Sequence, residues 1–254
     1  MQLMLDQICK SFGTKEVLKN ASFTFEQGKI YGLLGRNGSG KTTLFNCLSA
    51  EFPADGGTVS LVDEYGQTRT PKQGDIGYVL STPVVPEFLT GTEFVKFFQE
   101  ISQDKSGRTP DQWLELVGLE PDDRNRLMRG YSHGMKHKIQ MLCFLIGRPP
   151  VILLDEPLTS FDVVAALEMK NLLREMKGDH IILFSTHILH LAQDLCDEIV
   201  LLHQGELEGV DNAKIHTPEF ESYIVDLRTQ EEDGEEVAPC TSPVPPRSTA
   251  SAQP

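Results

Sequence analysis

The chain has 254 residues, of which 37 are acidic and 23 basic, and its formal net charge is −14. We do not expect nucleic acid as a partner, because phosphate-backbone binding needs clustered positive charge. With 39% apolar and 24% charged residues, the composition is that of a globular protein. The longest apolar run, residues 141–146, is far shorter than the roughly 18 residues of a spanning helix. We expect no signal peptide, and the five scattered cysteines without a CxxC pair favour a reduced, cytosolic protein.

Two alternating segments and five apolar runs predict the sheet structure. Residues 2–13 and 18–28 alternate apolar and polar side chains and are closed by turn signals, which predicts a half-exposed antiparallel pair. Later apolar runs, rich in branched residues, alternate with helix-like segments, which predicts a parallel sheet with crossover helices. These runs are residues 29–35, 74–80, 151–157, 180–186 and 197–202. The last of them are almost continuously apolar, as central strands covered on both faces require.

Residues 86–149 contain no convincing strand, which predicts a helical insertion. Thr92 is placed to cap its first helix, whose apolar residues recur at helical spacing: Phe94, Phe97, Phe98 and Ile101. Thr109 with Pro110 starts a second helix, and Gly118 ends it. We therefore expect one α/β domain over residues 1–228, made of a core (1–85 and 150–228) and this insertion. The acidic, proline-rich residues 229–254 should form a disordered tail.

A phosphate-binding loop is the strongest motif of the chain. Residues 35–42, GRNGSGKT, fit G-x-x-x-x-G-K-[ST], follow the apolar run 30–34 and precede a helix-like segment. Such a loop directs several backbone N–H groups at phosphate oxygens, and the following helix adds the positive end of its dipole. Lys41 would reach the β- and γ-phosphates, and Thr42 would place its hydroxyl on Mg²⁺. The predicted nucleotide contacts here are Gly35, Asn37, Gly38, Ser39, Gly40, Lys41, Thr42 and Thr43.

Acidic and polar residues follow two of the later apolar runs. Asp155 and Glu156 end the run 151–154, at the carboxyl edge of a strand, where ligands bind in open α/β sheets. Alone they could close an ordinary core strand. Beside a phosphate loop, Asp155 is expected to hold Mg²⁺ through its water shell, and Glu156 to orient or deprotonate the water that attacks the γ-phosphate. His187 ends the next run and could reach the γ-phosphate.

Together these motifs resemble the nucleotide-binding subunits of ATP-binding cassette (ABC) transporters, over about residues 1–215. The resemblance implies a P-loop NTPase (RecA-like) core with a mostly parallel sheet, an antiparallel β layer and an inserted helical subdomain. Residues 131–135, YSHGM, occupy the place of the family signature, commonly LSGGQ. Ser132, Gly134 and Met135 are thereby implied to contact the ATP of a second subunit, and Ser132 can also cap a helix. The YSHGM form resembles the export-type group whose permeases are separate chains.

Three further positions follow from the resemblance. Phe12 occupies the place of the aromatic residue that stacks on adenine, and a core role is the alternative. Asp162, in LTSFD, matches a loop that crosses the dimer, although the family usually writes SGLD there. Ser81 stands where the family has a glutamine that touches the Mg²⁺ site and links it to the helical insertion. The shorter serine could join a water-mediated Mg²⁺ contact but cannot span the distance that the glutamine spans.

The expected protein is an ATPase that binds ATP and Mg²⁺, pairs head to tail with a second ATPase subunit and docks on a separate integral membrane permease. Two ATP molecules would lie between the phosphate loop of one subunit and residues 132–135 of the other. Closure would reach the permease through residues 81–98, and docking on the permease would place the protein at the cytoplasmic face of a membrane. Export is expected from the YSHGM resemblance and from residues 89–98, LTGTEFVKFF. Two alternatives stay open: a soluble cassette ATPase that remodels an assembly, and a weakly hydrolytic nucleotide switch.

Overall fold

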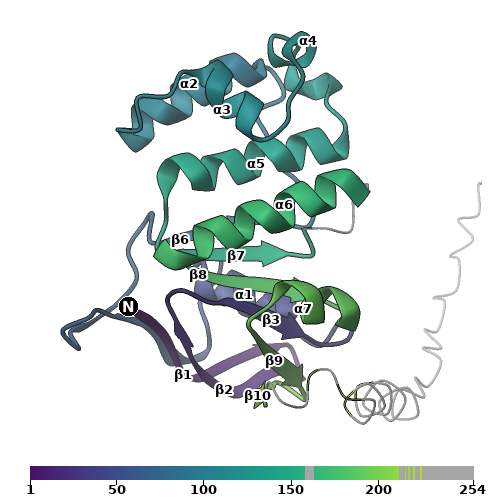
Figure 1. The fold of residues 1–254 in the computed structure, drawn as a ribbon. Helices are drawn as coiled ribbons and strands as arrows, with labels where there is room; N and C mark the ends of the chain where they lie inside the picture. Colours follow the sequence, from purple (N-terminus) through teal and green to yellow (C-terminus); the bar gives the residue numbers. More distant parts are fainter. Residues whose placement is uncertain (158–162, 212–214, 216, 218–219, 221–223, 225–254) are drawn as a thin grey trace, which may run out of the picture.

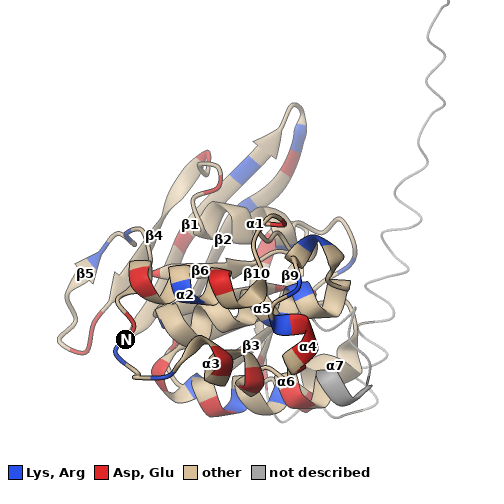
Figure 2. Cartoon of the chain, turned by 90° about the horizontal axis from the view of Figure 1, so that it is seen from above, with Lys and Arg blue, Asp and Glu red and all other residues tan. Residues whose placement is uncertain are grey.

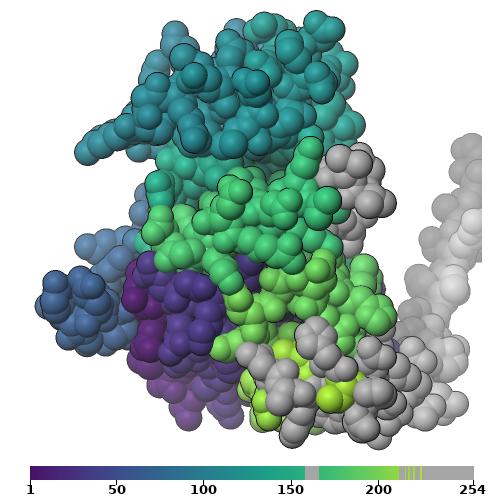
Figure 3. Space-filling view, viewed as in Figure 1, coloured from purple at the N-terminus to yellow at the C-terminus, as the bar shows by residue number. Residues whose placement is uncertain are grey.

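The computed structural model describes residues 1–157, 163–211, 215, 217, 220 and 224. Asp162 and the expected disordered tail lie outside these residues. The described strands form two sheets. Most helices lie on one side of them, and α1 (Lys41–Leu48) packs between the two sheets (Figure 1). In the space-filling view, the predicted helical insertion, residues 86–149 in teal shades, stands above α6 (Val163–Met176) and the sheets (Figure 3). Among the described helices, none has both the length and the apolarity to span a membrane.

The smaller sheet is antiparallel, with strand order β2-β1-β4-β5. Its strands are β1 (Gln2–Phe12), β2 (Lys15–Glu26), β4 (Gly56–Val62) and β5 (Thr68–Arg69). The predicted pair of alternating segments is confirmed, because β1 and β2 pair from Gln2 with Glu26 to Phe12 with Lys15. In both strands, buried apolar residues alternate with more exposed residues, as expected for strands with one solvated face.

The larger sheet has the order β10-β9-β3-β8-β7-β6 and supplies the centre of the fold. Its strands are β3 (Ile30–Leu34), β6 (Ile76–Val79), β7 (Val151–Asp155), β8 (Ile181–Thr186), β9 (Glu198–His203) and β10 (Glu206–Val210). The five predicted apolar runs are five of these strands, and they pair in parallel. Every residue of β3, β7 and β8 is buried, which confirms central strands covered on both faces. The predicted α/β fold class is therefore confirmed.

Helices cover the parallel sheet and fill the segment between β6 and β7. They are α1 (Lys41–Leu48), α2 (Gly91–Ser102), α3 (Pro110–Leu116), α4 (Pro121–Arg124), η1 (Met128–Gly130), α5 (His133–Gly147), α6 (Val163–Met176), η2 (Lys177–Asp179) and α7 (Leu189–Leu195). Seen from above, acidic and basic residues are interspersed on α2, α4 and α6 (Figure 2). A cluster around Phe25, Tyr31 and Phe45 joins the two sheets, and a separate one around Val95 and Trp113 holds α2, α3 and α5 together.

The first helix of the inserted segment differs from the prediction at its start. Thr90, not Thr92, caps α2: its hydroxyl accepts the Glu93 N–H at 3.2 Å, and the Glu93 carboxylate accepts the Thr90 N–H at 2.9 Å. Glu93 lies three residues after Thr90, which is the spacing a capping box requires. Thr92 instead donates its hydroxyl to the Arg124 carbonyl oxygen at 3.2 Å.

The apolar face predicted for α2 is only partly buried. Of the four predicted residues, Phe94 and Phe98 are half-buried, whereas Phe97 and Ile101 are 53% and 58% exposed. The fully buried side chain of this helix is Val95, which was not part of the predicted face. The second predicted start is confirmed: Thr109 caps α3 in another capping box, and Pro110 occupies its first turn. Part of the α2 surface is therefore left apolar and open to solvent.

Candidate active site

The loop between β3 and α1 forms an uncapped helix N-terminus. Gly40, at the N-cap, has φ +107° and offers no side chain to the first amides of α1. A Cβ at this position would lie 2.8 Å from Val17 Cγ1, so glycine is needed for space as well as for conformation. The first N–H groups of a helix have no intrahelical acceptor and carry the positive end of the dipole. The loop therefore presents backbone donors suited to a phosphate group.

Lys41 closes this loop on itself. The residue is only 6% exposed, and its Nζ donates to the carbonyl oxygens of Gly35 and Arg36, both at 2.8 Å. Gly35 is itself tightly enclosed, since a Cβ there would lie 2.6 Å from Ser39 Oγ. The ammonium group thus lies beside the loop that carries the backbone donors.

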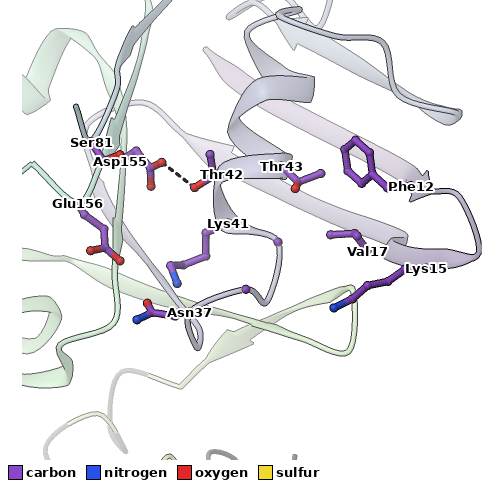
Figure 4. A pocket seen from close by; sticks show the side chains of 12 residues that line it. Phe12, Lys15, Val17, Asn37, Lys41, Thr42, Thr43, Ser81, Asp155 and Glu156 are labelled. Atoms are coloured by element: carbon purple, nitrogen blue, oxygen red, sulfur yellow. Dashed lines mark hydrogen bonds between the residues drawn. The ribbon is translucent and has the colours of Figure 1, made fainter. Parts of the chain in front are cut away.

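Asp155 is held by two hydroxyl groups at the carboxyl end of β7. Thr42 Oγ1, from the first turn of α1, donates to its Oδ2 at 2.8 Å (Figure 4). Ser185 Oγ, from the neighbouring strand β8, donates to its Oδ1 at 2.5 Å. Asp155 and Ser185 are register partners of two parallel strands, whose carboxyl ends meet at one sheet edge. This buried carboxylate therefore links the two strands to the phosphate-loop helix.

Glu156 is fixed through its backbone and its side chain. It has φ +48°, a left-handed conformation that is uncommon for a residue with a side chain. Its N–H donates to Ser185 Oγ at 3.1 Å and to the Ser185 carbonyl oxygen at 3.3 Å. Its Oε1 lies 2.9 Å from His187 Nδ1, and the two side chains are 22% and 37% exposed. Ser185 therefore connects both acidic residues. It was not among the predicted site residues.

A cavity of about 400 Å³ joins these groups to the loop. The predicted residues that line it are Phe12, Asn37, Gly38, Gly40, Lys41, Thr42, Thr43, Ser81, Asp155 and Glu156. Two further lining residues, Lys15 and Val17, were not predicted. They lie at the start of β2, close in sequence to Phe12, and the alternating pattern of that strand gave no sign of a ligand-facing position. The cavity brings together residues from four separate parts of the chain.

Phe12 stands at one end of this cavity, 52% exposed (Figure 4). Its ring meets the edge of Phe52 at a centroid distance of 5.8 Å, and Lys10 Nζ lies 5.7 Å from its centroid. An exposed aromatic ring supported from the side is suited to stacking on a flat base.

Tyr78 lies near Asp155. Burial and the neighbouring Asp155 carboxylate raise the pKa of Tyr78, which keeps its phenol neutral.

Other predicted site residues lie away from the cavity lining. Ser132 caps α5 by accepting the Met135 N–H at 3.2 Å, and Gly134 lies in the same first turn. His187 reaches the cavity only through Glu156. Gly35 and Ser39 lie close together within the loop and are not among the lining residues. Within the part of the chain that the structure describes, the three residues of the α5 start are therefore not joined to the phosphate loop.

The donor set has a definite chemistry. The Thr42 hydroxyl and the Asp155 carboxylate meet at 2.8 Å beside the loop amides, and the Ser81 hydroxyl lines the same cavity. Hydroxyl and carboxylate oxygens are the ligands that Mg²⁺ prefers, and Mg²⁺ is usually bound by one or two such groups together with phosphates. The residues present therefore fit a magnesium–nucleotide complex.

The family model for ABC transporters matches residues 18–159, more than half of the chain. An uncharacterized ABC transporter ATP-binding protein of Bacillus subtilis, YxlF, is 34% identical over 208 residues, which cover 81% of this chain and 69% of that protein. The chain belongs to the ATP-binding subunits of ABC transporters. As a member of this family of ATPases, it uses ATP as its nucleotide.

Two further similarities extend the comparison. The bacitracin transport ATP-binding protein BcrA of Enterococcus faecalis is 29% identical to this ABC subunit, over 83% of this chain and 70% of BcrA. A solved dimeric ATP-binding cassette in a post-hydrolysis state, bound to ADP and Pi, superposes with a TM-score of 0.69. It is 21% identical and covers 83% of this chain and 98% of its own, so it supports the fold.

Proposed function

We propose that this ABC subunit hydrolyses ATP to power export through a permease that is a separate chain. One observation carries the proposal: the Thr42 hydroxyl, both acidic residues and His187 form a continuous series of contacts beside the phosphate loop. A strand–loop–helix that only binds phosphate does not require a second carboxylate aimed into the same cavity. Glu156 beside Asp155 supplies the base that hydrolysis needs.

ATP is proposed to bind along the cavity, with its adenine on Phe12 and its phosphates on the loop. The loop amides from Asn37 to Thr43 would surround the β- and γ-phosphates. Lys41 would exchange its two carbonyl contacts for phosphate oxygens. Thr42 and Asp155, with Ser81 through water, would hold Mg²⁺, which when bound neutralises charge on the phosphates.

Glu156 is proposed as the general base. Its carboxylate would accept a proton from the water that attacks the γ-phosphorus, while the bond from that phosphorus to the bridging oxygen of ADP breaks. His187 would orient this carboxylate through the 2.9 Å contact between Nδ1 and Oε1. The left-handed backbone of Glu156, held by Ser185, would fix the position and direction from which the Glu156 side chain extends.

A second ATPase subunit, placed head to tail, would complete the site. The start of α5, with Ser132, Gly134 and Met135, is outside the cavity of its own chain but presents a helix N-terminus suited to a γ-phosphate. The dimeric form of the solved cassette supports pairing. Asp162 is proposed to lie in a segment that crosses this dimer, although it falls outside the described residues.

The permease is proposed to dock on the segment that follows Ser81. Four apolar side chains of residues 84–101 are strongly exposed: Val84 69%, Phe88 78%, Phe97 53% and Ile101 58%. Exposed apolar groups gathered near one helix are typical of a protein-binding surface. Docking there would place this subunit at the cytoplasmic face of a membrane. The YSHGM resemblance and the similarity to the bacitracin transport protein support export.

The test is a pull-down of tagged Glu156→Gln protein from native membranes in the presence of ATP, followed by identification of the retained proteins. Glu168→Gln, a change of a 59% exposed glutamate on α6, is the matched control. A polytopic membrane protein retained with ATP supports the proposal. Soluble partners alone, or normal ATP turnover by Glu156→Gln, would refute the transporter role or the base assignment.

Ser81 motivates a second candidate, a weakly hydrolytic nucleotide switch. Its short hydroxyl lines the cavity where the resemblance implies a longer glutamine. In that case the Ser81→Gln variant should hydrolyse ATP much faster than the natural protein. Steady-state turnover of the natural protein with its permease in the ordinary enzyme range, about 1–10³ per second, would exclude the switch.

A further inference from the structure

Two histidines meet on the first turns of α5, outside the nucleotide cavity. His133 and His137 are four residues apart, so they lie on the same face of the helix. Their Nε2 atoms are 3.1 Å apart, and the ring centroids are 4.8 Å apart. His137 is 1% exposed, whereas His133 is exposed to solvent. The pair therefore has a fixed inner member and an accessible outer one.

The inner ring is buried, and its other side lies beside the backbone of Ser81. A neutral imidazole offers one ring nitrogen to a metal ion. A histidine that binds a metal commonly donates its second N–H to a backbone carbonyl, which fixes the tautomer.

The distance between the two nitrogens suits joint coordination of one ion. Metal–nitrogen bonds of about 2.0–2.1 Å with ordinary angles place two imidazole nitrogens roughly 3 Å apart. An ion bound there would replace the direct contact between the two nitrogens. Access is from the exposed His133 side, and water can supply the remaining ligands.

We propose that His133 and His137 form a two-histidine site for a divalent transition-metal ion of the Zn²⁺ or Cu²⁺ class, and that its occupation slows ATP hydrolysis. Imidazole suits these ions, whereas Mg²⁺ prefers oxygen ligands and is not expected to compete. The slowing follows from position: His133 stands between Ser132 and Gly134. This part rests on the proposed function, in which that turn faces the nucleotide of the second subunit.

The surrounding charges permit a cation at this point. Lys136 pairs with Glu87 at 2.6 Å, and Lys138 donates to the Gly118 carbonyl oxygen at 2.9 Å, so both neighbouring ammonium groups have partners elsewhere. The positive end of the helix dipole opposes a cation, but by less than about tenfold in affinity. Among the residues that the structure describes, groups of three or more metal-ligating side chains are absent, so moderate affinity and exchangeable binding are expected.

The test is calorimetric titration of the full-length protein with Zn²⁺ and with Cu²⁺, in the presence of excess Mg²⁺. His133→Asn and His137→Gln each remove one ligand and keep a polar side chain at the position. His190→Asn, an exposed histidine on α7, is the matched control. We expect either ligand variant to bind metal at least about 10–100-fold more weakly, the loss that even outer-shell changes cause. Circular dichroism confirms that each variant is folded.

The same variants test the regulatory part. ATP turnover is measured at metal concentrations that saturate the calorimetric site, relative to the metal-free rate of each variant. Inhibition of the natural protein and of His190→Asn, but not of His133→Asn, supports the proposal. Equal metal binding by all folded variants would overturn the site. Binding without inhibition would overturn the regulatory role, and absent ATP turnover without metal would instead count against the proposed function.

Discussion

Removing the Ser185 hydroxyl is expected to lower the rate of ATP hydrolysis more than the affinity for ATP. This hydroxyl donates to Asp155 at 2.5 Å and accepts the Glu156 N–H at 3.1 Å, in a side chain with no exposed surface. Ser185→Ala keeps the size of the site almost unchanged and leaves both neighbours with one partner fewer. The change therefore acts on the position of two acidic groups without touching the loop that binds phosphate.

The magnitude follows from the two hydrogen bonds. A bond to a charged group contributes about 1.5–3 kcal/mol, and one to a backbone amide about 1 kcal/mol. The loss is smaller than the sum of these values, because Asp155 keeps its contact with Thr42 and the Glu156 N–H keeps its contact with the Ser185 carbonyl oxygen. We expect the free energy of unfolding to fall by about 2–3 kcal/mol. A loss of about 1.4 kcal/mol in Glu156 positioning corresponds to a kcat about tenfold lower.

The assay combines steady-state kinetics with urea unfolding. Thr186→Val is the matched control, since it removes a buried hydroxyl from the next residue of β8, where Oγ1 accepts the Ile188 N–H at 3.0 Å. Ser185→Ala should lower kcat with KM for ATP nearly unchanged, whereas Thr186→Val should lower stability only. The reasoning is refuted if Ser185→Ala hydrolyses ATP at the natural rate, or if both variants lose kcat equally.

Three further changes test other parts of the site and the fold. Phe12→Ala should weaken ATP binding by about 1–3 kcal/mol, the value of one stacked base, with little change in unfolding, as titration with a fluorescent ATP analogue would show. Gly40→Ala should abolish binding in the same titration, while Gly38→Ala, at φ +83° but with open space around it, should retain more. Burial alone would raise the pKa of Asp104, but hydrogen bonds from neighbours including Trp113 hold it at about 2. Its stabilisation is therefore complete above pH 4 and lost toward pH 2, so Asp104→Asn should cost about 0.5–1 kcal/mol at pH 7 and progressively less in urea titrations at lower pH.

Local chemistry explains which parts of the fold could be predicted. The loop at residues 35–42 and the capping box at Thr109 depend on neighbours in sequence, so their residue types are sufficient evidence. The start of α2 was misplaced because two threonines flank Gly91, and only the reach of Glu93 favours Thr90. Three strands that the sequence did not predict, β4, β5 and β10, are edge or near-edge strands with few buried side chains.

Active-site residues that belong to sequence motifs could be predicted. Residues that reach the site only through the pairing of strands could not. Asp155 and Glu156 stand out as adjacent acids after an apolar run. Ser185 does not, since a serine near the end of a buried strand is common. Its importance depends on lying opposite Asp155 in the parallel β7–β8 register, which is a property of two distant segments. Lys15 and Val17 likewise reach the cavity only because β2 passes beside the loop.

The two contacts between Lys41 Nζ and the loop carbonyls have a consequence for experiments on this protein. The ammonium group joins two carbonyl oxygens of the loop, so its removal is expected to loosen the loop both without and with bound phosphate. Lys41→Ala would therefore also change the protein without ATP. Weaker ATP binding by that variant would combine the lost attraction between Lys41 and phosphate with the lost preorganisation of the loop. Thr42→Val leaves both Lys41 contacts in place, so weaker ATP binding by that variant reports the loss of the Thr42 hydroxyl without a change in the Lys41 contacts.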